Sequence, residues 1–325
     1  MSELVERFQA GDVRALARAI SLVERADPDA ATLLADLRAV AGPQPPRVGV
    51  TGAPGAGKST LLGAMIRVAR RDKRSVAVLA VDPSSPFSGG ALLGDRLRMD
   101  EHLLDPGVYV RSMGARGQLG GLAPGAAEAA WLLGAHGFAE VLVETVGTGQ
   151  SELDLPSLVD TTVLVLNPNA GDAIQLEKAG VLEVADVYVV NKTDLPGADR
   201  LVRDLHTMLG LGTCGSWVPR VVATVANRPD GSVEQVWDAV REHRAFLADH
   251  PEGRALAAGK VRESAAALVA ARARAWALAA CERDGSLTAV DGRRSPHVIA
   301  DRLLELAGCR AGEHTSNHHV RGRQA

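Results

Sequence analysis

A glycine-rich loop is the first feature of the sequence that could do chemistry. Residues 52–59 read Gly-Ala-Pro-Gly-Ala-Gly-Lys-Ser and match the pattern G-x-x-x-x-G-K-[ST]. Such a loop points successive backbone N–H groups at phosphate oxygens, and the start of the following helix adds partial positive charge. We expect Lys58, also a catalytic candidate, to reach the β- and γ-phosphates and the Ser59 hydroxyl to ligate Mg²⁺. The predicted nucleotide-binding residues here are Gly52, Ala53, Pro54, Gly55, Ala56, Gly57, Lys58, Ser59 and Thr60.

A second motif, Asn191-Lys192-Thr193-Asp194, follows the apolar run 187–190. N-K-x-D at the end of a strand, downstream of a phosphate loop, is typical of guanine binding. The Asp194 carboxylate can accept hydrogen bonds from N1–H and the exocyclic amine of guanine, whereas adenine offers neither donor. A site with such polar partners can discriminate by about 10⁴. Asn191 is expected to tie this loop to the phosphate loop, and the Lys192 stem to lie over the base plane. The sequence therefore predicts GTP and GDP as ligands.

Three carboxylates are candidates to hold the metal ion together with Ser59. Asp82 and Glu144 each end a predicted strand, so both are expected at the carboxyl edge of the sheet, where α/β proteins bind ligands. Asp95 follows Asp82 along the chain. Because Mg²⁺ prefers oxygen ligands and keeps several waters, all three are predicted to hold it directly or through water. Asp95 and Glu144 are catalytic candidates as well. The alternative for each is an ordinary surface or capping carboxylate.

Seven short β-rich runs are needed to position these motifs, with helix-compatible segments between most of them. Several runs, such as 76–81, are apolar without polar alternation, which is typical of strands buried on both faces of a parallel sheet. We therefore predict an α/β fold with a mostly parallel sheet flanked by helices. The predicted strands are 47–51, 75–81, 108–112, 140–145, 161–167, 186–191 and 220–225.

Helical patterns occupy both ends of the chain. Residues 2–41 form an N-terminal helical extension that a Gly/Pro-rich loop closes, and Asp12 is the predicted N-cap of its second helix. The apolar stripe of that helix is Val13, Leu16, Ile20 and Val23. From residue 232 onward the pattern is helical again, and 254–283 forms a long Ala/Arg-rich helix or a pair of helices.

The composition excludes several classes of protein. The 325 residues carry a net charge of −3, so nothing favours a nucleic-acid or anionic-membrane partner. The three cysteines are widely spaced and form no C-x-x-C pair, which fits a reducing compartment. The chain starts without the apolar region of a signal peptide, and its apolar runs are strand-sized. We expect a cytoplasmic protein that binds neither nucleic acid nor membrane.

The string 144–152, Glu-Thr-Val-Gly-Thr-Gly-Gln-Ser-Glu, stands where Asp-x-x-Gly is usual. It resembles the corresponding string of the MeaB/ArgK family, the GTPases associated with methylmalonyl-CoA mutase. Further segments that resemble the family are 81–85, 88–90, 93–96, 111–113, 117–121 and 170–180, and the likeness covers roughly residues 12–308. The chain departs from the family at Thr148, at 167–169 and at 223–227, where a further guanine-contacting element is expected.

The resemblance implies a P-loop GTPase of the SIMIBI class with a C-terminal helical dimerisation arm, and hence a homodimer. It also implies a chaperone that couples GTP hydrolysis to cofactor delivery and protection of an adenosylcobalamin-dependent acyl-CoA mutase. The arm carries Val261, Leu268, Trp276 and Leu278, which would pair with a second copy or, alternatively, pack within the chain. The expected division is 1–46 N-terminal extension, 47–250 P-loop GTPase domain, 251–310 C-terminal arm and 311–325 flexible tail.

GTP is expected to order segments 82–98 and 144–152, because the γ-phosphate and Mg²⁺ give them contacts that GDP lacks. Gly147 would place its backbone N–H on the γ-phosphate. Gln150 is a candidate to orient the attacking water, and its alternative role is that of a polar residue at a helix start. Four arginines are candidates to supply positive charge for hydrolysis in a partner complex, and the sequence does not indicate which of them, if any, does so: Arg96, Arg98, Arg111 and Arg116.

Three other functions compete with the chaperone GTPase. A metallochaperone GTPase for nickel or zinc usually has Cys/His ligands near its switches, whereas His314, His318 and His319 lie in the tail here. A kinase of a transport protein would transfer phosphate to a protein acceptor. A structural GTP-binding scaffold would bind nucleotide without turnover.

Overall fold

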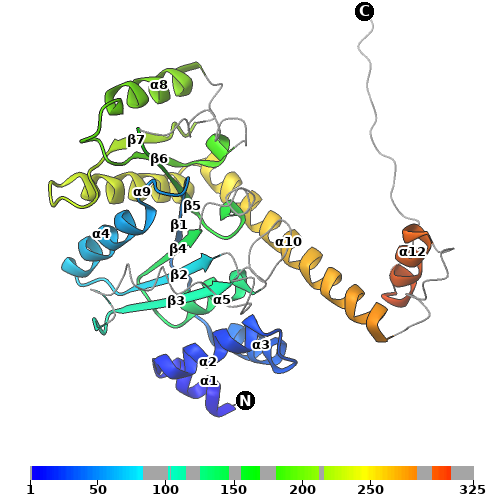
Figure 1. Ribbon diagram of the computed structural model, residues 1–325. Coiled ribbons are helices and arrows are strands. Elements are labelled where there is room, and N and C mark those ends of the chain that lie inside the picture. The colour runs from blue at the N-terminus through cyan, green and yellow to red at the C-terminus, as the bar shows by residue number, and fades with distance from the viewer. Residues whose placement is uncertain are drawn as a thin grey trace, which may run out of the picture. The chain divides into compact units, whose positions relative to one another are not determined.

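Seven parallel strands form the centre of the fold, in the order β3-β2-β4-β1-β5-β6-β7 (Figure 1). The computed structural model describes residues 2–82, 102, 104–114, 125–145, 155–168, 181–211, 216–283 and 295–308. The strands are β1 Arg47–Thr51, β2 Val76–Asp82, β3 Val108–Gly114, β4 Glu140–Thr145, β5 Thr161–Leu166, β6 Val187–Val190 and β7 Arg220–Ala223. Every predicted strand is confirmed, and the predicted fold class with it.

The continuous apolar runs are explained by burial on both faces of the sheet. In β2, Val76 and Val78 pack into one hydrophobic cluster, while Ala77, Leu79 and Val81 pack into another on the opposite face. All five side chains are buried, so neither face requires polar residues.

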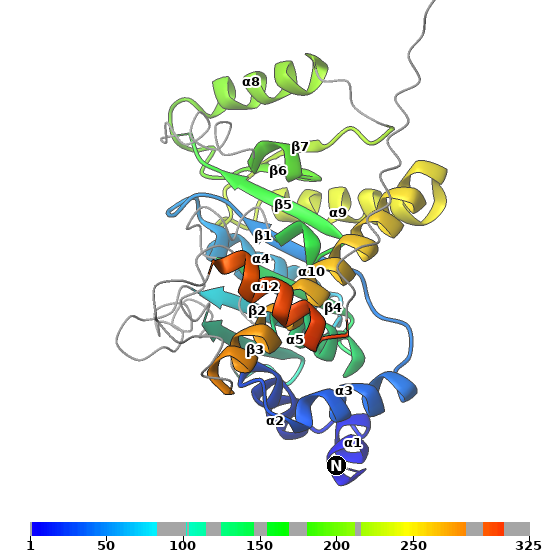
Figure 2. The ribbon, with the colours of Figure 1, turned by 90° about the vertical axis from the view of Figure 1, so that its right-hand side faces the viewer.

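Helices cover both faces. Helices α4 (Lys58–Arg71) and α9 (Ser232–Asp249) share a cluster with one face, and α5 (Ala126–Ala135) and the N-terminal helices share a cluster with the other. Helix α8 (Ala198–Leu211) packs over β5 and β6. In both views the N-terminal helices lie beyond the β3 edge (Figure 2). The remaining helices are α1 Ser2–Gln9, α2 Val13–Glu24, α3 Asp29–Val40, α10 Pro251–Arg283 and α12 Pro296–Leu306.

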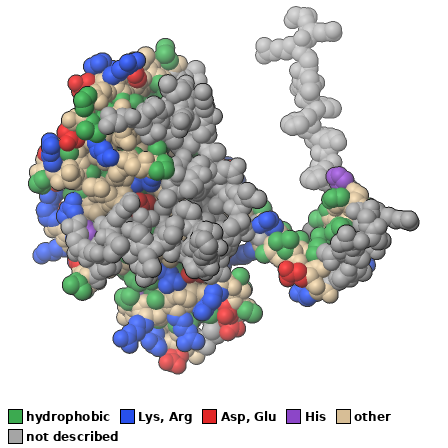
Figure 3. All heavy atoms as spheres, in the orientation of Figure 1, with side chains coloured by type: hydrophobic (Ala, Val, Ile, Leu, Met, Phe, Trp, Pro, Cys, Tyr) green, Lys and Arg blue, Asp and Glu red, His purple; other side chains and the backbone are tan. Residues whose placement is uncertain are grey.

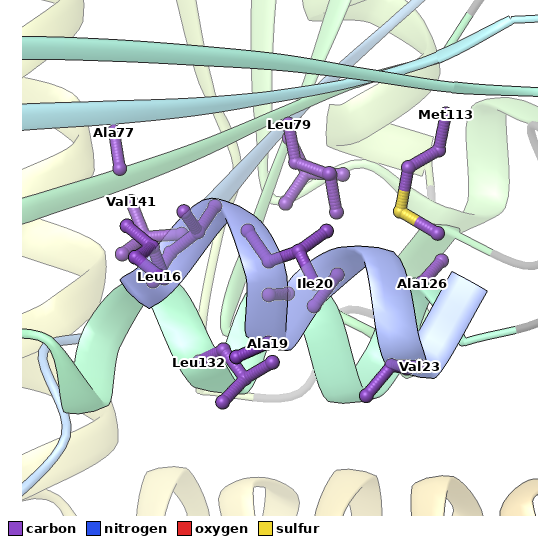
Figure 4. Close-up of a cluster of buried hydrophobic side chains, with 14 of the residues drawn as sticks. Leu16, Ala19, Ile20, Val23, Ala77, Leu79, Met113, Ala126, Leu132 and Val141 are labelled. Atoms are coloured by element: carbon purple, nitrogen blue, oxygen red, sulfur yellow. The ribbon is translucent and has the colours of Figure 1, made fainter. Parts of the chain in front are cut away.

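Helix α2 packs against α5 and shares one hydrophobic cluster with it and with one face of the sheet. Its side chains Leu16, Ala19, Ile20 and Val23 point toward strand and α5 residues in Figure 4, and all four are buried. The predicted N-cap is confirmed, because the Asp12 carboxylate accepts a 2.8 Å hydrogen bond from the backbone N–H of Arg14.

The predicted apolar stripe of α2 is wrong at Val13, which is 46% exposed. This residue is the first of the helix, one turn before Leu16, so it lies at the end of the helix where the contact with the sheet has stopped.

Arg111 links β3 to the N-terminal helices. Its Nη2 donates to the Glu24 carboxylate at 2.6 Å and to the Ser21 hydroxyl at 3.1 Å. Arg111 was a candidate to supply positive charge for hydrolysis. Because Glu24 of α2 neutralises that charge, a structural role for Arg111 is favoured. The other three arginine candidates lie outside the described residues.

The chain divides into two compact units, Met1–Ala265 and Ala266–Ala325, and the four-part division predicted from the sequence stays a prediction. In the first unit, Lys260 of α10 donates to Asp160 O at 2.8 Å and to the Asp186 carboxylate at 3.0 Å. The second unit contains the rest of α10 and α12, and Figure 3 shows hydrophobic side chains on its surface.

Among the described residues one helix, α10, is long and apolar enough to cross a membrane by length and composition. Only 6% of its most apolar window is buried, so the apolar side chains lie on the surface of the chain. The expected absence of a membrane partner stays a prediction.

A buried histidine of α9, His243, shares the Asp186 carboxylate with Lys260 of α10. His243 is fully buried, its Nδ1 lies 2.9 Å from the Thr161 hydroxyl, and its Nε2 lies 3.3 Å from the Asp186 carboxylate. The pKa of His243 is lowered from 6.5 to about 4, chiefly because the side chain is buried. The carboxylates of Asp186 and Asp160 oppose this shift, and the positive charge of Lys260 adds to it. The folded protein therefore holds this imidazole neutral.

We predict that His243 makes folding stability fall as the pH drops from 6.5 to 4. Within this window the unfolded chain binds a proton at His243 and the folded chain does not, so each step down in pH favours unfolding; below about 4 the effect is complete. The total effect on the free energy of unfolding is about 3 kcal/mol. Urea unfolding of His243→Phe across this range should show a flatter pH profile than the unsubstituted protein. His206→Asn, at an exposed histidine of α8, is the control; equal slopes for His243→Phe and the unsubstituted protein would contradict the account.

Candidate functional site

The phosphate loop joins the carboxyl end of β1 to the start of α4. Gly57 caps the helix with φ 96° and Gly52 has φ 139°, both in the region that favours glycine. A Cβ at Gly57 would lie 2.2 Å from the side-chain amide of Asn191, and one at Gly52 would lie 2.1 Å from the carbonyl of Val165. The motif needs glycine at these positions because neighbouring loops and strands approach its backbone closely.

Lys58 is the first residue of α4 and is buried at the loop. Its Nζ donates to Gly52 O at 2.6 Å and to Ala53 O at 3.1 Å. The ammonium group is therefore held over the loop that would surround the phosphates. A phosphate group offers this cation stronger, charged acceptors than two carbonyls.

The metal candidates meet at the next residue. Ser59 Oγ donates a 2.7 Å hydrogen bond to Glu144 Oε1 at the end of β4, and both side chains are buried. The first turn of α4 and the end of β4 thus place the Ser59 hydroxyl and the Glu144 carboxylate side by side. Their oxygen chemistry fits Mg²⁺, which is often held by one or two protein ligands, phosphate oxygens and waters. Within the described residues no group of three or more His, Cys, Asp or Glu residues forms a metal site.

Asn191 joins its own loop to the phosphate loop, as the sequence predicted, and also to the loop after β7. Its Nδ2 donates to Ala56 O in the phosphate loop at 3.0 Å. Its Oδ1 accepts from the backbone N–H of Ala226 at 3.1 Å and from the Thr224 hydroxyl at 3.3 Å, both in the loop after β7. This loop is the stretch in which a further guanine-contacting element was expected.

Lys192 also reaches the phosphate loop, because its Nζ donates to Gly55 O at 2.8 Å. Its own backbone has φ 59°, a value that non-glycine residues adopt rarely. The side chain therefore spans the distance from the base loop, residues 191–194, to the phosphate loop, residues 52–59. Its stem was predicted to cover a base along this path.

Asp194 has a partner that sequence reasoning missed. Arg228 donates from Nη2 to Asp194 Oδ2 at 3.2 Å. Arg228 also lines a groove of about 710 Å³ between α4 and the loop after β7, together with Thr60, Arg67, Arg71 and Asn227. The stretch 223–227 was recognised as a site element, but no sequence pattern indicates that the next residue contacts Asp194, the carboxylate that is predicted to bind the base.

The remaining candidates are placed only in part. Asp82 is the last residue of β2, where its backbone pairs in register with Gly114. Asp95, Gly147 and Gln150 lie outside the described residues. Of the phosphate-loop residues, Ala56 is buried, while Pro54, Gly55 and Thr60 are exposed.

Comparison with known proteins agrees with this geometry. A protein of Pyrococcus abyssi, classed by name with the GTPases, is 47% identical over 251 residues, covering 76% of this chain and 77% of that protein. The GTPase ArgK of Escherichia coli is 35% identical over 263 residues, with 76% and 77% covered. The mouse protein named methylmalonic aciduria type A homolog, mitochondrial, is 40% identical over 201 residues, covering 60% of this chain and 48% of that protein.

A solved structure has the same architecture along almost the whole chain. The crystal structure titled LAO/AO transport system kinase superposes with a TM-score of 0.62 at 25% identity, covering 94% of this chain and 97% of the other. The family model described as methylmalonyl Co-A mutase-associated GTPase MeaB matches residues 16–280. The phosphate loop, the base loop and the strands that carry them all fall within that match, and the chain therefore belongs to the MeaB family of GTPases.

Proposed function

We propose that this GTPase is a chaperone of an adenosylcobalamin-dependent acyl-CoA mutase, coupling hydrolysis of GTP to cofactor delivery and to protection of the mutase. The observation that supports the nucleotide-binding part of the proposal is the Asn191 side chain, which hydrogen-bonds to the phosphate loop and to the loop after β7. The family description, which names association with methylmalonyl-CoA mutase, supports the choice of partner. The name of the mouse relative supports it as well.

The described residues account for the nucleotide end of this function. Lys58 would leave the carbonyls of Gly52 and Ala53 for the β- and γ-phosphates. Ser59 and Glu144 would hold Mg²⁺ directly or through water. The ion would neutralise charge on the phosphate oxygens during transfer to water.

The ends of β2 and β4 provide the route from nucleotide to partner in this proposal. Strand β4 lies next to β1, and β2 lies next to β4. The segments that follow these two strands, 82–98 and 144–152, are the proposed switches. A γ-phosphate that orders these segments would change the surface offered to the mutase. Asp95, Gly147 and Gln150 belong to these segments and keep their proposed roles in metal binding, phosphate binding and water orientation.

A kinase is the second candidate, because the superposed crystal structure is titled as a transport system kinase. The two functions differ in the acceptor of the γ-phosphoryl group, which is water in one case and a protein in the other. Incubation with labelled GTP separates them: the chaperone proposal requires free phosphate, and labelled protein would favour the kinase.

We also propose that α10 pairs with its copy in a cytoplasmic homodimer. Val261, Val269 and Leu278 are 65%, 66% and 54% exposed, an unusual exposure for large aliphatic side chains on one helix. Pairing would remove this apolar surface from water.

Replacing Lys58 by Ala is expected to weaken GTP affinity by about 10- to 100-fold, because a charged hydrogen-bond donor to the phosphates is lost. Isothermal titration with GTP and Mg²⁺ measures the change. Arg200→Ala, an exposed residue of α8, is the control and should bind as the unsubstituted protein does. Unchanged affinity in Lys58→Ala, with an unchanged melting temperature, would refute the phosphate-loop assignment.

Phosphate release is expected to be slow for the protein alone and faster with a stoichiometric acyl-CoA mutase, because the partner would stabilise the ordered switch segments. A coupled phosphate assay with and without the mutase measures this. Bovine serum albumin at the same concentration controls for crowding. A turnover rate that the mutase leaves unchanged would contradict the coupling, and no release in either case would favour a scaffold.

Sedimentation equilibrium at micromolar concentration is expected to show a dimer, and Val269→Asp to shift it toward monomer, because a charge would be buried in the proposed interface. Val13→Asp, at an exposed valine of α2, is the matched control and should leave the mass unchanged. A monomeric unsubstituted protein would contradict the pairing of α10. In a separate experiment with lipid vesicles, co-sedimentation of the unsubstituted protein that Val269→Asp abolishes would also contradict it, because the apolar face would then bind lipid.

A further inference from the structure

Two loops form the sides of the place where a guanine base must lie. One is the base loop with Asp194, and the other is the loop after β7, which is held against it by Asn191. Two further hydrogen bonds join these loops, since the backbone N–H and the hydroxyl of Thr193 both donate to Thr224 O at 3.1 Å. The spacing of the loops is therefore fixed by the buried hydrogen bonds of Asn191 and the partly buried ones of Thr193.

Arg228 crosses from one loop to the other. Its backbone N–H closes a turn onto Val225 O at 2.8 Å, so its origin in the second loop is fixed. Its guanidinium nevertheless contacts the carboxylate of Asp194 in the first loop. The side chain thus ends at the acceptor that the guanine edge would use.

The guanidinium group and the guanine edge present the same chemistry to a carboxylate. Guanine offers N1–H and an exocyclic N–H from adjacent atoms, and arginine offers a planar fork of N–H donors. Both match the two oxygens of one carboxylate. A guanidinium placed on Asp194 is therefore an internal substitute for the base.

We propose that Arg228 competes with guanine for Asp194 and thereby weakens nucleotide binding and speeds GDP release. The inference rests on the guanine-reading role of Asp194. The pair can be broken at small cost, because the side chains are 59% and 38% exposed and exposed ion pairs contribute little. The groove beside α4 gives the displaced arginine a place next to Asn227 and Pro229.

The size of the effect follows from the exposure of the pair. Removing an exposed ion-pair competitor should tighten GDP binding by about two- to fivefold, with a similar slowing of dissociation. A residue that instead clamped the base, or held Asp194 in position, would give the opposite sign when removed.

Dissociation of a fluorescent GDP analogue, measured by displacement with excess GDP, tests the proposal. Arg228→Ala is expected to release it about two- to fivefold more slowly than the unsubstituted protein. Arg71→Ala is the matched control, because Arg71 lines the same groove but pairs with Glu234 at 2.8 Å instead of Asp194. Unchanged or faster release in Arg228→Ala would overturn the proposal.

A second experiment tests whether Arg228 acts on GDP release through the Asp194 carboxylate. Asp194→Asn is paired with xanthosine diphosphate, whose 2-carbonyl can accept from the new amide while the amide oxygen accepts N1–H. Adding Arg228→Ala in that background should not slow release further, because the charged partner of Arg228 is gone. Slowing of the same size would assign the effect to another contact and overturn the proposal.

The outcomes separate this inference from the function on which it rests. Equal affinities of the unsubstituted protein for GDP and ADP would remove the guanine assignment and the inference together. Selective GDP binding combined with unchanged or faster release in Arg228→Ala would remove the inference alone.

Discussion

The side-chain amide of Asn191 fixes the geometry on which the rest of the site depends. The residue is 2% exposed, and its donor and its acceptor are both used, one on the phosphate loop and the other on the loop after β7. Truncating it would leave buried backbone groups without partners, at about 1–3 kcal/mol each. Because Gly57 approaches the same amide closely, the glycine of the phosphate loop and the asparagine of the base loop constrain each other.

The parallel sheet keeps nucleotide chemistry and the attachment of α10 apart. The phosphate loop and the base loop follow the carboxyl ends of strands, and Glu144 lies at the carboxyl end of β4. Thr161, in contrast, begins β5, and Asp186 precedes β6. His243 and Lys260 contact Asp186 at that amino-terminal edge. Side-chain changes at the attachment of α10 therefore lie about a strand length away from the phosphate loop.

Much of the fold could be predicted from the sequence because its signals are local. The strands are apolar on both faces, and the phosphate-loop glycines meet a steric demand that any such loop makes. The contacts of Asn191 could be predicted in part, since the N-K-x-D pattern carries that role. The pairs Arg228–Asp194 and Arg111–Glu24 could not, because they join residues 34 and 87 positions apart and depend on how the loops and helices pack. Val13 was misassigned because helical periodicity defines a face and does not say where along the helix that face stops making contact.

The central claim is that one cleft binds phosphate at one end and reads a guanine at the other. Isothermal titration of the unsubstituted protein with GDP and with ADP, both with Mg²⁺, tests it most directly. The geometry of Lys58, Asn191 and Asp194 predicts that GDP binds more tightly by up to about 10⁴-fold. Equal affinities for the two nucleotides would contradict it.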